Sequence, residues 1–299
     1  MSEWLVDVAG LTRAFERNTA LEQVDFRARQ GLVYGLVGAN GAGKTTLLRH
    51  ILGLLRAQAG TVRVFGLDPV RHPVDVLRRV GYLSEERELP EWMRIDELMR
   101  YTQAYYPSWD MDYARELVST FGLDVKKKVK ELSKGMRAQV GIVAAVAHRP
   151  DLLILDEPST GLDAAVRQDI LDAIVRTVAD DGRTVIFSSH LLDEVERMSD
   201  HVTMVHEGRV VVDGTLETVR GAHQRSHVLF AARLERAPVI EGALAVEGEG
   251  RSWTVIHNGA LDRFRASVAL QQGEVVQSRE ATLEEIFVAR VGRTAEPAG

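Results

Sequence analysis

Short apolar runs separated by glycine and polar turns are spread along the first two thirds of this 299-residue chain. Val33 to Val37 ends at a glycine, and Leu152 to Leu155 and Thr184 to Ser188 are bounded by polar turns. Continuous apolar runs of this length are typical of strands buried on both faces of a parallel sheet. A helical pattern from Ala164 to Val178 connects the last two runs, so the sequence predicts a β–α–β unit.

Three further patterns accompany these central strands. The first is a set of short strand-like segments at residues 4–8, 24–28 and 61–65. In the second, residues from about 90 to 148 have a helical period, with Asp96 and Asp110 as expected N-caps. In the third, apolar runs on both sides of Glu207-Gly208 predict a β-hairpin. A helix is also expected from Lys44 to Leu55.

The character of the sequence changes after Gly221. Beyond it, strand-like and helical segments occur at residues 227–232, 252–256, 260–270 and 282–290. We therefore predict an α/β fold with two domains. Residues 1–220 form the larger domain, with a helical subdomain at about 85–148, and residues 221–299 form a small α+β domain.

The composition narrows the possible functions. Hydrophobic residues make up 45% of the chain and charged residues 27%, which is sufficient for an ordinary globular core. The absence of cysteine excludes disulfides, zinc–thiolate sites and a thiol nucleophile. A net charge of -6 argues against a nucleic-acid partner. With no secretory signal at Met1 to Trp4 and no apolar run approaching ~18 residues, we expect a cytoplasmic protein that reaches a membrane only through a partner.

Residues 38–46 carry the most specific motif. They match G-x-x-x-x-G-K-[ST] between an apolar strand and a helix, the context this phosphate-binding loop requires. Glycines let successive backbone N–H groups point at phosphate oxygens, and the helix start adds positive dipole. Lys44 adds a mobile charge, and the Thr45 hydroxyl is an expected Mg²⁺ ligand. The expected nucleotide-binding residues are Gly38, Ala39, Asn40, Gly41, Ala42, Gly43, Lys44, Thr45 and Thr46.

Two acids, Asp156 and Glu157, follow the run from Leu152 to Leu155. Acids in this position lie at the carboxyl edge of a parallel sheet, beside the phosphate loop. Neighbouring side chains on a strand point in different directions, so the two acids can take different roles. We predict that Asp156 holds Mg²⁺, mostly through water. Glu157 is the predicted base that polarises the water attacking the γ-phosphate of ATP.

Residues 132–139, Leu-Ser-Lys-Gly-Met-Arg-Ala-Gln, resemble the L-S-G-G-Q signature of the ABC ATPases, with Lys134 and Met136 as departures. Residues 158–163, Pro-Ser-Thr-Gly-Leu-Asp, resemble the D-loop of that family, and Ser-Ser-His at 188–190 resembles its H-loop. Together with the phosphate loop, these motifs cover most of residues 1–215 with spacing similar to the family's. The chain thus resembles the ATP-binding subunits of ABC transporters.

The resemblance implies a P-loop NTPase fold with a mixed, mainly parallel sheet, an antiparallel β subdomain and a helical subdomain. It also implies two subunits facing head to tail, as a homodimer or as a heterodimer with a second ATPase subunit. Each ATP then lies between one phosphate loop and the signature of the other subunit, where Ser133 and Gly135 face the γ-phosphate. The implied catalytic residues are Glu157, Lys44 and His190, the last contacting the γ-phosphate and orienting Glu157.

Two further sites follow from the resemblance. Phe15 stands where the family stacks an aromatic ring on adenine. In the segment from Gly81 to Glu86, Glu85 replaces the family's Q-loop glutamine. A carboxylate can ligate Mg²⁺ but cannot donate an amide hydrogen bond. Glu85 therefore joins Thr45 and Asp156 as an expected metal ligand, while Glu86 is an open alternative for the Q-loop role.

A cluster of aromatic and sulfur-containing side chains in the helical part has two open interpretations. It forms either a groove for a cytoplasmic helix of a membrane subunit or the core of the helical subdomain itself. Its members are Trp92, Met93, Tyr101, Tyr105, Tyr106 and Trp109.

Residues 106–110 and 282–287 resemble segments of drug and antibiotic exporters of the ABC-2 type. The expected function is therefore export driven by binding and hydrolysis of ATP with Mg²⁺, through separate transmembrane permease subunits at the inner face of the membrane. The alternative is a soluble ABC ATPase acting on nucleic acid or ribosomes, although the sequence lacks a second cassette, long coiled coils and zinc inserts. A third interpretation, a binding module without turnover, is opposed by Glu157.

Overall fold

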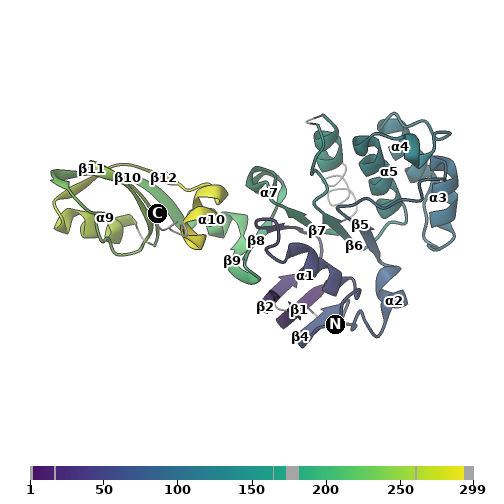
Figure 1. Ribbon diagram of the computed structural model, residues 1–299, viewed down its shortest axis with the longest axis horizontal. Helices are drawn as coiled ribbons and strands as arrows, with labels where there is room; N and C mark the ends of the chain where they lie inside the picture. The colour runs from purple at the N-terminus through teal and green to yellow at the C-terminus, as the bar shows by residue number, and fades with distance from the viewer. Residues whose placement is uncertain (1–2, 17, 164, 173–181, 260, 293–299) are drawn as a thin grey trace. The chain divides into compact units, whose positions relative to one another are not determined.

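The computed structural model describes residues 3–16, 18–163, 165–172, 182–259 and 261–292 (Figure 1). The chain divides into two compact units, Met1–Val210 and Val211–Gly299. This division falls within the strand β9 (Arg209–Thr215), before the predicted boundary at residue 220. None of the described helices is long and apolar enough to span a membrane.

A six-stranded sheet in the order β5-β6-β7-β3-β8-β9 is the centre of the first unit. The neighbours from β5 to β8 pair in parallel. The strands predicted from apolar runs are confirmed, and β3, β6 and β7 are buried along their whole length. The sheet consists of β3 (Val33–Val37), β5 (Val80–Leu83), β6 (Leu152–Asp156), β7 (Thr184–Ser189), β8 (His201–His206) and β9.

Two elements predicted next to strands of this sheet, a hairpin and a helix, have different outcomes. The hairpin at Glu207-Gly208 is confirmed, since both residues have positive φ, 46° and 76°, as a tight turn between twisted strands requires. The helix predicted from Ala164 to Val178 falls partly outside the described residues, while residues 165–172 are helical.

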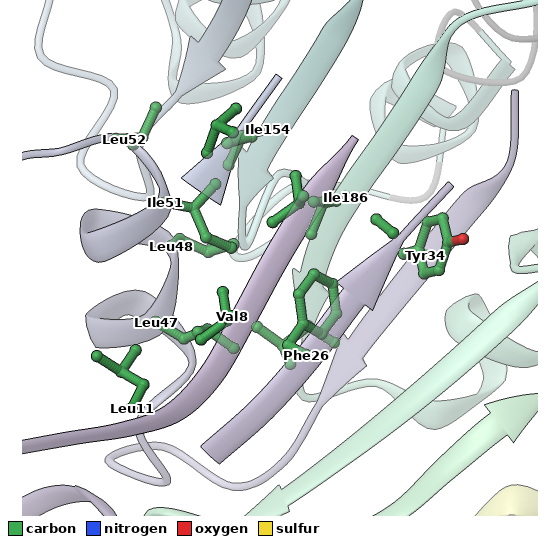
Figure 2. Packing of buried hydrophobic residues seen from close by; sticks show 14 of the residues in the cluster. Val8, Leu11, Phe26, Tyr34, Leu47, Leu48, Ile51, Leu52, Ile154 and Ile186 are labelled. Atoms are coloured by element: carbon green, nitrogen blue, oxygen red, sulfur yellow. The ribbon is translucent and has the colours of Figure 1, made fainter. Parts of the chain in front are cut away.

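The antiparallel part of the first unit is a three-stranded sheet in the order β2-β1-β4. It contains β1 (Val6–Phe15), β2 (Asn18–Ala28) and β4 (Ala59–Val64). The helix α1 (Lys44–Ile51) packs into the core that this sheet shares with the parallel one, and Figure 2 shows side chains of α1 beside those of β1, β2 and β6. The predicted helix extended too far, to Leu55, because Gly53 follows the C-cap with a left-handed φ of 72°.

The helical part contains α3 (Ile95–Gln103), α4 (Met111–Thr120), a 3₁₀ turn (Val129–Glu131) and α5 (Lys134–Val146), with the short α2 (Pro73–Leu77) preceding it. Asp110 caps α4 as predicted, since its side chain accepts a hydrogen bond of 2.9 Å from Tyr113 N.

The prediction that Asp96 caps α3 was wrong. The helix begins two residues earlier than predicted, with Arg94 as N-cap, because the side chain of Glu97 accepts a hydrogen bond of 2.9 Å from the backbone N–H of Arg94.

The aromatic cluster of the helical part separates into two groups. Met93 and Trp109 are buried in the core, whereas Trp92, Tyr101 and Tyr105 are exposed. Tyr106 is half-buried and stacks on His148 with ring centroids 3.9 Å apart. The core interpretation is therefore confirmed for Met93 and Trp109, and a groove for a helix of a membrane subunit stays a prediction.

The second unit is a three-stranded antiparallel sheet, in the order β11-β10-β12, with helices and a core of its own. Val228, Phe230, Trp253, Phe264 and Val268 form that core. The strand β12 was not predicted, because its residues are mostly polar and only weakly alternating in burial. The elements are α8 (Leu216–Gly221), β10 (His223–Leu234), β11 (Ala243–Asn258), α9 (Leu261–Leu270), β12 (Gly273–Glu280) and α10 (Leu283–Val291).

Truncation of α1 in the shared core should destabilise the first unit. Leu48 is fully buried between the two sheets, so Leu48→Ala is expected to lower the free energy of unfolding by about 2–5 kcal/mol. Leu54→Ala, at an exposed position, is the matched control. Urea unfolding followed by tryptophan fluorescence measures both, and equal midpoints for the two variants would contradict the packing described.

Candidate functional site

Residues 38–43 form a curled loop that connects β3 to α1, and residues 44–46 are the first residues of that helix. Gly43, the N-cap of α1, has a φ of 111°, and a Cβ at this position would lie 2.5 Å from Ala20 O. A Cβ at Gly38 would lie 2.2 Å from Val205 O. Both positions therefore require glycine, and the loop can approach neighbouring backbone more closely than any other residue would allow.

This loop borders a pocket of about 340 Å³. Residues 39–46 form most of its wall, together with Ala20, Glu85 and Glu157. Gly43 has no side chain to cap α1, so the backbone N–H groups at the helix start are available to an anion. The pocket thus brings together the predicted phosphate cradle, the predicted base and two predicted metal ligands, Thr45 and Glu85.

Lys44 is buried at the start of α1, with a relative exposure of 5%. Its Nζ donates to Gly38 O at 2.6 Å and to Ala39 O at 3.3 Å. The same atom lies 3.1 Å from Glu157 Oε1, forming a buried ion pair. Since a buried ammonium needs such partners, the loop carbonyls and the carboxylate together fix the charge beside the pocket.

Glu157 directly follows β6 and adopts a left-handed φ of 49°. Its Oε2 accepts hydrogen bonds from His190 Nδ1 at 2.7 Å and from Thr160 Oγ1 at 2.8 Å. Burial acts to raise the pKa of Glu157, but the hydrogen bonds from His190 and Thr160 and the charge of Lys44 hold that pKa below its ordinary value. The carboxylate is therefore ionised at neutral pH.

Asp156 ends β6 and is buried. Its Oδ1 accepts a hydrogen bond of 2.6 Å from Ser188 Oγ, and that same hydroxyl oxygen accepts from Glu157 N at 2.9 Å. Ser188, on the neighbouring strand β7, therefore links the side chain of Asp156 to the backbone of Glu157.

The oxygen donors predicted for Mg²⁺ have the chemistry that this cation prefers. Thr45 offers a hydroxyl and Glu85 a carboxylate, and both line the pocket of the phosphate loop. Asp156 adds a second carboxylate at the end of the adjoining strand. In the described parts of the chain no group of three or more His, Cys, Asp or Glu side chains is arranged to hold a metal. The donor set thus fits a cation that keeps several waters and binds phosphate oxygens.

The loop after β5 places the neighbouring residues Glu85 and Glu86 in two different pockets. Glu85 lines the pocket of the phosphate loop, whereas Glu86 lines a second, larger groove of about 730 Å³. Of the two alternatives for the Q-loop role, the geometry favours Glu85 as the one facing the nucleotide pocket.

Four predicted nucleotide contacts do not line this pocket, namely Phe15, Gly38, Ser133 and Gly135. Ser133 caps α5, accepting from Met136 N at 3.2 Å, and neither Ser133 nor Gly135 lines the pocket of the phosphate loop. Phe15, at the end of β1, is 41% exposed. The guanidinium of Arg13 lies over its ring, 4.6 Å from the ring centroid. A contact of Phe15 with adenine stays a prediction.

Three further residues around Glu157 were missed by the sequence reasoning. Arg87 donates from Nη2 to Pro158 O and Thr160 O, both at 3.0 Å. Burial lowers the pKa of Arg87, and the charge of Glu85 opposes this shift. Only the position of Thr160 next to the acid pair offered a signal in the sequence.

Glu194 is the third of these residues. It lies in α7 (Leu192–Met198) and is buried, with Oε2 accepting from Ser159 Oγ at 2.7 Å and from Ser189 Oγ at 3.0 Å. It therefore connects the segment after Glu157 with the residue that precedes His190.

Known proteins share both the sequence and the fold of this chain. The family model for "ABC transporter" matches residues 21–160. The daunorubicin resistance ATP-binding protein DrrA3 of Streptomyces coeruleorubidus is 34% identical over 308 residues, covering 98% of this chain and 97% of that protein. The chain belongs to the ATP-binding proteins of ABC transporters. A second member, NatA of Bacillus subtilis, is 34% identical over 225 residues, covering 73% of this ABC ATPase and 91% of NatA.

Solved structures agree with this assignment. The ATP-binding subunit of an ABC transporter superposes with a TM-score of 0.67 at 32% identity, over 73% of this chain and 92% of that one. The cassette MJ0796, in a dimeric post-hydrolysis state bound to ADP and Pi, has the same fold, with a TM-score of 0.64 at 20% identity over 71% and 98% of the two chains.

Membership of the family confirms the predicted P-loop NTPase fold and the predicted ATPase activity of this ABC ATPase. The roles of individual residues are a separate matter and stay predictions.

The ionised carboxylate of Glu157 should contribute stability that depends on pH. Because its folded-state pKa is lowered, that contribution is complete above its unfolded value of ~4.3 and is lost as pH falls through the lower folded value. The difference in urea midpoint between the wild type and Glu157→Gln should therefore shrink as pH falls from ~7 to ~3. Glu116→Gln, an exposed matched control, should show no such trend. A difference that grows on acidification would contradict the geometry.

Proposed function

We propose that this ABC ATPase powers an exporter, as a dimer that binds ATP between two copies and transmits closure and reopening to separate membrane subunits. The observation that carries the proposal is the contact of Glu157 with both Lys44 and His190 at the phosphate-loop pocket. The carboxylate of Glu157 thus contacts both the Lys44 ammonium, which can bind phosphate oxygens, and His190, which can contact the γ-phosphate.

The first step is binding of the triphosphate. Backbone N–H groups of residues 39–46 and the positive end of α1 receive the phosphates. The phosphate oxygens compete with Glu157 for the ammonium of Lys44, which lies 3.1 Å from the carboxylate. Binding therefore draws Lys44 toward the nucleotide and releases one oxygen of Glu157 for a water molecule.

The second step is attack by water on the γ-phosphorus. Glu157 is ionised and accepts a proton from that water, while the bond from the leaving β-phosphate oxygen to phosphorus breaks. His190 and Thr160 hold the other carboxylate oxygen, which fixes the direction in which the base points. His190 is part-exposed and is also available to the γ-phosphate oxygens.

Thr45, Asp156 and Glu85 are the residues that would hold Mg²⁺ beside the phosphates. The bound cation would neutralise charge on the β- and γ-phosphate oxygens.

A second copy is required to complete the site. Ser133 is exposed at the start of α5, and a capped helix start of this kind suits a phosphate. Ser133 and Gly135 lie away from the phosphate-loop pocket of their own chain. They can contact ATP only if it is bound by the other subunit, which is the head-to-tail arrangement expected from the sequence.

The membrane partner is proposed to dock in the groove of about 730 Å³ that Glu86 lines. Its apolar wall suits one face of an amphipathic cytoplasmic helix, and Arg49, Glu86, Arg87 and Glu88 supply charges beside it. Docking there would hold the protein at the inner face of the membrane. Among the apolar lining residues are Leu52, Leu55, Leu77, Leu83, Leu89 and Ala145.

The direction of transport is proposed from the relatives. Their names include a daunorubicin resistance ATP-binding protein and a bacitracin transport ATP-binding protein. Export of a drug-like molecule is the activity that these names suggest for this chain.

Removal of the base should block turnover while leaving nucleotide binding intact. Glu157→Gln is expected to slow ATP hydrolysis by ~10²–10⁴, the usual contribution of a positioned general base. Phosphate release measures the rate, and equilibrium dialysis with ATP measures the affinity. Glu116→Gln, on the exposed face of α4, is the control. Hydrolysis at the wild-type rate in Glu157→Gln would remove the assignment of the base.

Mixing two inactive variants should restore activity if the sites are shared. Ser133→Arg is expected to abolish turnover by blocking the opposite site, and Lys44→Ala by weakening ATP binding in its own. A heterodimer of the two contains one site with an intact phosphate loop and an intact signature. The mixture should therefore recover hydrolysis that neither variant shows alone. Full activity of Ser133→Arg by itself would exclude the shared geometry.

A further inference from the structure

Arg87 is an unusual residue for a loop position. It lies four residues after the end of β5, has a left-handed φ of 51°, and is only 6% exposed. A buried guanidinium on such a backbone is costly, so surrounding contacts must hold it. The hydrogen bonds of its guanidinium within the described residues are those from Nη2 to Pro158 O and Thr160 O.

These two carbonyl groups belong to the segment that directly follows Glu157. Thr160, held by Arg87 through its carbonyl, donates from Oγ1 to Glu157 Oε2 at 2.8 Å and from its backbone N to Glu157 O at 3.2 Å. On the other side of the segment, Glu194 accepts from Ser159 Oγ at 2.7 Å. Arg87 thus holds the segment that carries the Thr160 hydroxyl, which is one of the two groups donating to Glu157 Oε2.

The other two nitrogen atoms of the Arg87 guanidinium do not stabilise the fold through hydrogen bonds to described residues. Nε and Nη1 of Arg87 are buried without an acceptor among the described residues. Leaving buried donors unsatisfied costs stability, so an arginine at this position is better explained by its action on residues 158–160 than by packing. Arg87 also lines the proposed docking groove, as do its neighbours Glu86 and Glu88.

We propose that Arg87 is a positioning residue for Glu157. It fixes Thr160 through the carbonyl groups of Pro158 and Thr160, and Thr160 fixes the carboxylate. Because the same side chain borders the groove, it also joins the proposed docking site to the base. This inference rests on the proposed role of Glu157.

The test is a comparison of kinetic constants in the full-length chain. Arg87→Ala should lower kcat for ATP hydrolysis by about 10- to 100-fold, as expected for a misplaced catalytic group, while the Kd for ATP changes by less than about twofold. The matched control is Arg78→Ala, at an exposed position outside both pockets. A kcat equal to that of Arg78→Ala, or an ATP affinity that falls in parallel, would overturn the proposal.

If Arg87→Ala folds poorly, conservative variants at Arg87 and chemical rescue with guanidinium ion still test the proposal. A lysine ammonium can donate to both carbonyl groups, so Arg87→Lys should recover most of the lost kcat, whereas Arg87→Met should not. Guanidinium ion at millimolar concentration should partly restore Arg87→Ala. Equal rates for the lysine and methionine variants would contradict the proposed contact.

A double-mutant cycle tests the route through Thr160. Thr160→Val removes the hydroxyl that donates to Glu157, so adding Arg87→Ala to it should slow hydrolysis by less than about twofold more. Fully multiplied effects would show that Arg87 acts by another route. Glu157→Gln in the same assay separates the two proposals. If it hydrolyses normally, the proposed function fails, and if it is slow while Arg87→Ala is normal, only the inference about Arg87 fails.

Discussion

The buried ion pair between Lys44 and Glu157 is the interaction on which the site depends. The two charged atoms lie 3.1 Å apart, and both side chains are 5% exposed. Such a pair is stable only when neighbouring groups satisfy the remaining donors and acceptors. Here the carbonyls of Gly38 and Ala39 do so for the ammonium, and His190 and Thr160 do so for the carboxylate. Each of these groups reaches its place through the fold.

The parallel sheet explains how much of this could be predicted. Because β3, β6 and β7 are neighbouring parallel strands, motifs at their carboxyl ends meet at one edge. The phosphate loop, Glu157 and His190 each directly follow one of these strands, so their meeting was predictable from local patterns. The glycines of the loop added a second, independent signal, since two of them are required by close backbone contacts.

Arg87 and Glu194 could not be found in the same way. Arg87 bonds backbone carbonyls and Glu194 bonds the hydroxyl of Ser159, all distant in the sequence, and a contact of this kind leaves no periodic pattern. The errors at element ends have equally local causes. Gly53 ends α1 early, and Glu97 moves the start of α3 ahead of Asp96. The strand β12 lacks the apolar alternation by which the others were recognised.

The backbone of Glu157 has an evolutionary consequence. A glutamate with φ of 49° is strained, whereas glycine adopts this conformation freely and asparagine tolerates it better than most residues. Replacing the acid would relieve this strain, but it would also leave the ammonium of Lys44 buried without its charged partner, which is the larger cost. A duplicated copy released from selection for turnover would therefore gain no folding stability by losing this glutamate, because the ion pair favours the acid even where hydrolysis no longer matters.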